Sequence, residues 1–180
     1  FKKSVFVDSE NNNIEINKVS DSKATNNKTK DKYSAEDKIA KIDTFSLVDS
    51  NNKAVENINS GSGCTFSYSI DCFEASEDVQ TGFAIKDRRG TVVFGASNIS
   101  KNLSKLKISG GDTLKVQTNL TIWLAAGDYS INIGIGRAKD GEFFDFLEDC
   151  IHFKVLGPHG IFTTSYVNLQ DTFSIEKNKA

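Results

Sequence analysis

The sequence has few of the residues on which catalysis and metal binding depend. It contains two histidines, His152 and His159, and three cysteines whose spacing matches no zinc or thioredoxin pattern. It also lacks a nucleophile elbow, a Walker loop and a dinucleotide fingerprint, because the Gly-Ile-Gly at residues 134–136 lies inside an expected strand and opens no helix. We therefore expect no catalytic residues, no metal site and no cofactor.

The net charge is small, and the sequence has no long apolar run. The net charge of −2 and the dispersed basic residues provide no field that attracts phosphate backbones, which argues against a nucleic-acid partner. No apolar run approaches the roughly 20 residues that span a bilayer, and the N-terminus has no secretory signal. An odd number of cysteines fits a reducing compartment, although a disulfide between Cys72 and Cys150 is conceivable. The sequence has no methionine and begins with Phe1, so we expect it to be a segment of a longer protein.

Composition divides the chain into two parts. Residues 1–36 are rich in Asn, Lys, Ser and Asp, and too few apolar side chains are present there to offset the entropy of ordering. We expect this part to be a flexible linker and residues 37–180 to form one domain. In that domain, strand patterns separated by turn signals are predicted at about 39–48, 64–73, 79–87, 91–97, 112–124, 129–138 and 150–156.

Seven strands at this spacing predict an all-β fold, an immunoglobulin-like or jelly-roll β-sandwich. The clearest signal lies at residues 112–138, where two alternating runs meet at an Ala-Ala-Gly-Asp corner. Tyr129, just after that corner, is expected to donate its hydroxyl to the upstream backbone. The last 24 residues contain strand-like sequence at about 158–175, which could pair with its own sheet or exchange with a second subunit.

Strand alternation suggests where a ligand could bind. Gly134 and Gly136 share the outward face of one strand, and glycine there weakens a strand unless something approaches the sheet closely. We therefore expect a shallow trough floored by small residues, including Gly82 and Ala84 of a neighbouring strand. The side chains expected to give polar contacts to a hydrated, hydroxyl-rich or anionic ligand there are those of Lys86, Asn132, His152 and Lys154. Trp123, near the corner, is the residue expected to offer a platform for a sugar ring.

Alternatives remain at each of these positions. The outward face could be merely solvated, with glycines easing the sheet twist, and Trp123 could pack in the core or an interface instead of stacking on a sugar ring. The Phe-Phe-Asp-Phe sequence at 143–146 is read as a loop that covers the core end, makes a subunit contact or edges a pocket. Acidic pairs such as those of a glycosidase could form from a scattered set of carboxylates: Asp87, Asp128, Asp145, Glu148 and Asp149.

The order of motifs resembles a known family. The segments KIDTFSLVDSNNKAV, TFSYSID, GFAIKDRRGTVVFGASN, LAAGDYSINIGIG and CIHFKVLG, within residues 37–170, are similar to the C-terminal domain of Wzt-type proteins, the ATP-binding subunits of O-antigen polysaccharide ABC transporters. The most specific parts of this likeness are residues 82–98 and 124–129.

The resemblance implies a carbohydrate-binding β-sandwich that follows a linker from an ATPase domain and dimerises by exchanging its C-terminal strand. It implies recognition of the modified non-reducing end of a lipid-linked O-antigen polysaccharide, which licenses export. The implied partners are that polysaccharide, a second copy of the chain and the transporter's transmembrane subunit, at the cytoplasmic face of the inner membrane. It identifies no binding residues in this sequence, and a structural or protein-binding sandwich of the adhesin or assembly type remains the alternative.

Overall fold

The computed structural model describes residues 38–157, 166 and 167. The chain divides into two units, Phe1–Lys32 and Tyr33–Ala180, and every described residue belongs to the second. The predicted linker at 1–36 lies outside the described residues, as does nearly all of the C-terminal segment at 158–175. Those two predictions are therefore not addressed by the structure.

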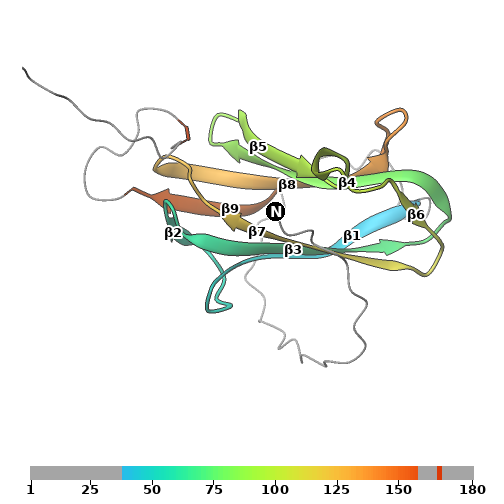
Figure 1. The fold of residues 1–180 in the computed structure, drawn as a ribbon, viewed down its shortest axis with the longest axis horizontal. Helices are drawn as coiled ribbons and strands as arrows, with labels where there is room; N and C mark the ends of the chain where they lie inside the picture. The colour runs from blue at the N-terminus through green and yellow to red at the C-terminus, as the bar shows by residue number, and fades with distance from the viewer. Residues whose placement is uncertain (1–37, 158–165, 168–180) are drawn as a thin grey trace, which may run out of the picture. The chain divides into compact units, whose positions relative to one another are not determined.

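Two β-sheets face each other, as Figure 1 shows. The smaller sheet has the strand order β1-β3-β7, formed by Ala40–Asp49, Gly63–Cys72 and Thr113–Thr121. The larger sheet has the order β2-β9-β8-β4-β5, formed by Asn57–Asn59, Phe143–Leu156, Gly127–Arg137, Ser76–Asp87 and Val92–Ser97. Strand β6 (Leu106–Ile108) also pairs with β4, and one 3₁₀ turn, Ile99–Lys101, follows β5. The predicted all-β sandwich is confirmed.

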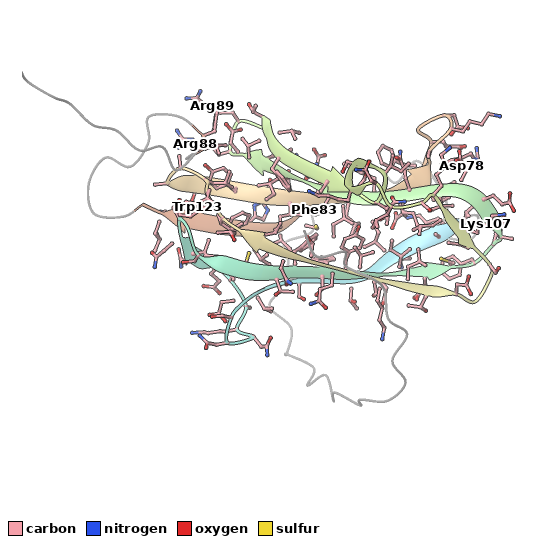
Figure 2. The ribbon with its side chains drawn as sticks, in the orientation of Figure 1. Asp78, Phe83, Arg88, Arg89, Lys107 and Trp123 are labelled. Carbon is pink, nitrogen blue, oxygen red and sulfur yellow. The ribbon has the colours of Figure 1, made fainter. Side chains whose placement is uncertain are left out.

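The core lies between the sheets, where the inward-facing side chains of the strands pack together. On β8, Ile131, Ile133 and Ile135 are all fully buried. Phe66 of β3 meets Phe83 of β4 with ring centroids 4.9 Å apart, and Figure 2 shows Phe83 within the space between the layers. Such aromatic pairs bury large apolar areas, so this contact helps to hold the two sheets together.

The predicted strands differ from the observed ones mainly at two places. Strand β9 begins at Phe143, so the sequence 143–146, read as a loop, is its first part. Two register shifts against β8, near Asn132 and between Ile135 and Gly136, break the alternation that would have identified a strand. The short strands β2 and β6, three residues each, were missed because so few residues cannot show a period.

The corner before β8 has the expected structure. The hydroxyl of Tyr129 donates a hydrogen bond to the backbone oxygen of Ala125 at 2.9 Å, which confirms the prediction of a tyrosine corner. The three cysteines are free thiols, and burial raises the pKa of Cys64 and Cys150 to about 11. Among residues 38–157, 166 and 167, no helix has the length and apolar character to cross a membrane.

Candidate functional site

A hollow of about 450 Å³ lies on the outer face of the larger sheet, away from the core. Strands β5, β4, β8 and β9 all contribute to it, and we call it the outer trough. It is the kind of concave, mostly apolar surface with a few polar groups that small-ligand sites have.

Small residues form its floor. Across β4 and β8 the outward-facing pairs run Gln80–Gly136, Gly82–Gly134, Ala84–Asn132 and Lys86–Ser130. On the next strand, β5, Gly95 lies opposite Ala84 and Ser97 lies opposite Gly82. Consecutive strands therefore place glycine or alanine side by side, and the sheet is hollowed there because no bulky side chain rises from it.

Two phenylalanines form the wall on the β9 side. Phe143 lies opposite Gly136 and Phe146 opposite Gly134, with their ring centroids 5.0 Å apart. Their exposed fractions are 56% and 45%, which is large for aromatic side chains. The rings also explain the glycine at 134, since a Cβ there would lie 2.7 Å from a Phe143 ring carbon. Gly134 and Gly136 thus floor the trough and are partly covered by residues of β9.

Asn132 is the one predicted site residue that lines the trough. Its side-chain oxygen Oδ1 accepts the backbone N–H of Asp149 at 2.9 Å, within the β9 bulge. Asp149 has a φ of 51°, a left-handed conformation that aspartate tolerates better than most residues. Asn132 therefore joins the end of the trough to the bulge.

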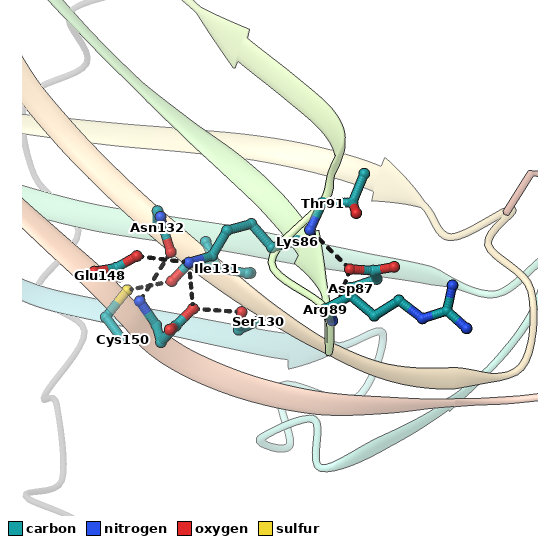
Figure 3. Close-up of polar contacts among 10 residues, drawn as sticks. Lys86, Asp87, Arg89, Thr91, Ser130, Ile131, Asn132, Glu148 and Cys150 are labelled. Carbon is teal, nitrogen blue, oxygen red and sulfur yellow. Dashed lines mark hydrogen bonds and ion pairs between the residues drawn. The ribbon is translucent and has the colours of Figure 1, made fainter.

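Lys86 pairs with Ser130, the outward-facing pair next to that of Ala84 and Asn132. Its ammonium group already forms two ion pairs. Its Nζ lies 2.9 Å from a carboxylate oxygen of Glu148 and 3.0 Å from one of Asp149, as Figure 3 shows for Glu148. The hydrogen bond to Glu148 is the main cause that raises the pKa of Lys86, and burial opposes it. The hydroxyl of Ser130 donates to Asp149 at 2.6 Å, and this bond is the main cause that lowers the pKa of Asp149.

His152 and Trp123, also predicted from the sequence, lie outside the trough lining. His152 is exposed on β9 opposite Ser130, close enough to Asp149 for its charge to contribute to the lowered pKa of that carboxyl. Trp123 is partly buried, and its ring lies over Gly61 in the turn before β3. Figure 2 places Trp123 at the end of the sandwich that also carries Arg88 and Arg89. The structure thus gathers Lys86, Asn132 and His152 around Asp149 and leaves Trp123 apart.

Of the carboxylates that could have formed an acidic pair, Asp145 and Asp87 have separate contacts, whereas Glu148 and Asp149 both bind Lys86. Asp145 is buried and binds Lys38 at 2.7 Å and the backbone N–H of Ile42 at 2.9 Å. Asp87 accepts the backbone N–H groups of Arg89 and Thr91 in the turn after β4. No group of three or more His, Cys, Asp or Glu in the described ranges could hold a metal ion.

Sequence reasoning found only part of the trough lining. It placed Phe143 and Phe146 in a loop and gave the edge of a pocket as one of three readings, and the structure places both on β9 at the trough wall. Gly95, Ser97 and Ser100 were not considered. The signal that was available is the run of three small residues, Gly95, Ala96 and Ser97, in the strand expected at about 91–97.

A second hollow, of about 520 Å³, lies at one end of the sandwich. It is lined by the turn at residues 87–89, the corner at 125–129 and Tyr166. The backbone oxygen of Tyr166 accepts the N–H of Ala125 at 2.9 Å, and Val167 forms a bridge with Leu124. The described C-terminal residues therefore contact the tyrosine corner.

Comparison with known proteins agrees with the fold. A family model described as the Wzt C-terminal domain matches residues 31–169. A solved structure described as the C-terminal domain of wzt is similar with a TM-score of 0.67 and 19% sequence identity, covering 77% of this chain and 85% of that one. No curated protein sequence matches the chain.

Two more distant likenesses are too weak to carry an argument. Pseudomonas fluorescens alkylpurine DNA glycosylase AlkC has a TM-score of 0.45 and 12% identity, over 66% of this chain and 30% of that one. A β-glucuronidase from glycoside hydrolase family 2 has a TM-score of 0.40 and 18% identity, over 57% of this chain and 10% of that one.

Proposed function

Since the chain belongs to the Wzt C-terminal domain family, we propose that it is a carbohydrate-binding module of an O-antigen exporter. It binds the modified non-reducing end of a lipid-linked O-antigen polysaccharide, and this recognition licenses export by an ABC transporter. In the whole protein, residues 1–36 link the module to an ATPase domain at the cytoplasmic face of the inner membrane. The module acts as a homodimer, with the segment at about 158–175 exchanged between subunits, next to the transmembrane subunit.

The observation that supports a glycan ligand is the composition of the outer trough. Its floor consists of glycine and alanine, which lets a ring approach the sheet backbone. Phe143 and Phe146 offer exposed aromatic surface, and a pyranose ring packs its C–H groups on such a face. Ser97, Ser100 and Asn132 add hydroxyl and amide groups that can exchange hydrogen bonds with sugar hydroxyls.

Of the residues predicted from the sequence, Asn132 is the one we propose as a direct contact. Lys86 lies beside the trough and acts by holding Asp149 of the β9 bulge in an ion pair. His152 lies beyond the trough lining, opposite Ser130. Trp123 contacts ligand only if a long glycan extends beyond the trough lining.

Filling the trough tests this function. A Cβ at Gly95 would lie 3.6 Å from the nearest heavy atom, the backbone oxygen of Phe83, so Gly95→Leu adds bulk without a backbone clash. Gly63→Leu is a matched control on the other sheet, where the nearest atom would lie 3.9 Å away. The full 180-residue chain and both variants are titrated with a panel of capped O-polysaccharides by calorimetry.

We expect one polysaccharide to bind, Gly95→Leu to weaken that binding at least tenfold, and Gly63→Leu to leave it unchanged. Absence of binding to every capped O-polysaccharide would overturn the proposal. Equal binding by the Gly95→Leu variant would show that the glycan site lies elsewhere.

A protein-binding module is the second candidate, and exposed apolar side chains favour it. Val92, Phe94 and Leu103, in or near the edge strand β5, are 59%, 38% and 42% exposed. Unpaired edge strands accept added strands from partners. Capture of a protein that O-polysaccharide does not displace would support this alternative.

A further inference from the structure

The side chains that line the outer trough carry no charge. Its polar members are Gln80, Thr81, Ser97, Ser100 and Asn132, and the remaining lining residues are glycine, alanine, valine and phenylalanine. Hydroxyl and amide groups pair with the hydroxyl, ether and amide groups of a neutral sugar. They cannot neutralise a phosphate, sulfate or carboxylate, and an ionised group taken out of water needs a charge partner.

The nearest cation at the Asn132 end is already neutralised. Lys86 binds both Glu148 and Asp149, at 2.9 and 3.0 Å, so this group of three carries one net negative charge. Lys86 is buried, whereas the side chains of Glu148 and Asp149 are 60% and 42% exposed. A ligand that approaches this end therefore meets carboxylates before it meets the ammonium group.

Arg137 supplies no free cation at the opposite end of the trough. It follows Gly136 on β8 and so points to the other face of the sheet, where its guanidinium carbon lies 5.6 Å from the ring centroid of Phe144. Its Nη1 is also paired, with Asp140 at 3.0 Å and Glu142 at 2.8 Å. On the β5 side, Lys101 lies 5.9 Å from the ring centroid of Phe94, and neither of these residues lines the trough.

We propose that the outer trough selects an uncharged saccharide end with an apolar surface and rejects ends that carry phosphate, sulfate or carboxylate. This inference rests on the proposed function, because it names the chemical class of glycan that the same site takes. The aromatic wall contacts the apolar part of the sugar, either the C–H face of the ring or a methyl-bearing substituent. The hydroxyl and amide groups contact its oxygens, and the net negative group of Lys86, Glu148 and Asp149 at the Asn132 end repels anions.

Paired glycans test this selectivity directly. The full chain is applied to an array of O-polysaccharide ends and synthetic oligosaccharides, in which each neutral non-reducing end is matched with its phosphate ester and its sulfate ester. We expect a neutral member to bind and its two anionic partners to bind at least tenfold more weakly. A lysine placed in the trough by Gln80→Lys should reduce that preference at least fivefold, because it supplies the missing cation.

The control for this variant is Gln117→Lys, which makes the same change on the exposed face of β7 in the other sheet. It should leave the preference unchanged. Preferred binding of an anionic member would overturn the inference while leaving a glycan-binding function in place, provided that Gly95→Leu abolishes that binding. Absence of binding to every array member overturns the proposed function and this inference with it.

Discussion

Asn132 of β8 holds the backbone of Asp149 on β9 through a hydrogen bond of 2.9 Å from the Asp149 N–H to Oδ1. The bond spans a place where the two strands lose register, since Ile131 lies opposite Ile151 but Ile133 lies opposite Leu147. Without it, a backbone N–H in the bulge would lose its acceptor. This side chain therefore has a structural role in addition to its place in the trough.

Replacing Asn132 should destabilise the fold. Asn132 is 7% exposed, and Asn132→Ala leaves the Asp149 N–H without its partner, which typically costs about 1–3 kcal/mol. Equilibrium unfolding in urea measures the change. Asn119→Ala is the matched control, because Asn119 also accepts one hydrogen bond from a neighbouring strand, from Thr65, but at an exposed position. That variant should stay within about 0.5 kcal/mol of the parent. Equal losses in the two variants would contradict a special role for Asn132.

The acid stability of the domain should depend on Asp149. The Ser130 hydroxyl, and after it Lys86, lower the pKa of this carboxyl below its ordinary value of 3.8. A group with a lower pKa in the folded state stabilises the protein above its unfolded pKa, and that contribution is lost as pH falls through the folded value. Stability should therefore decline below about pH 4, and Asp149→Asn should be less stable at pH 7 but show a shallower decline in acid.

Urea unfolding at intervals from pH 7 to pH 3 makes this comparison. Asparagine suits the left-handed backbone at position 149, so the substitution adds little strain. Asp43→Asn removes a like charge from an exposed position on β1 and reports the effect of net charge alone. Parallel stability curves for the parent and Asp149→Asn down to pH 3 would contradict the assignment.

The sequence predicted the sandwich well because alternation reports burial directly. The inward run of Tyr129, Ile131, Ile133 and Ile135 is buried as its period of two requires. Half-buried Leu114 and Val116 on β7 follow the same rule less completely, because β7 is the edge of a three-stranded sheet. Long strands with one apolar face are thus readable from a single sequence.

The trough was only partly predictable, for two physical reasons. Alternation placed Gly82, Ala84, Asn132 and Gly134 on one outward face, and all four line the hollow. Alternation fails at a bulge, however, so it could not bring Phe143 and Phe146 onto that face. It also says nothing about which partner a charged side chain meets, and the ion pairs of Lys86 depend on the path of a bulged strand.

The glycines of the trough should differ sharply in how they tolerate a methyl group. At Gly136 an added Cβ would come closer to the backbone oxygen of Glu142 than real Cβ atoms do and would lie 3.0 Å from the Cα of Phe143, so β8 and β9 would have to separate. Overpacking of this kind typically costs about 1–3 kcal/mol, and we expect that loss for Gly136→Ala.

At Gly95 the nearest atom to an added Cβ would lie 3.6 Å away, an ordinary contact. Gly95→Ala should be neutral or stabilise by up to about 1 kcal/mol, because alanine restricts the unfolded chain. Urea unfolding of both variants separates the two cases, and an unchanged midpoint for Gly136→Ala would mean that β9 does not lie against this glycine.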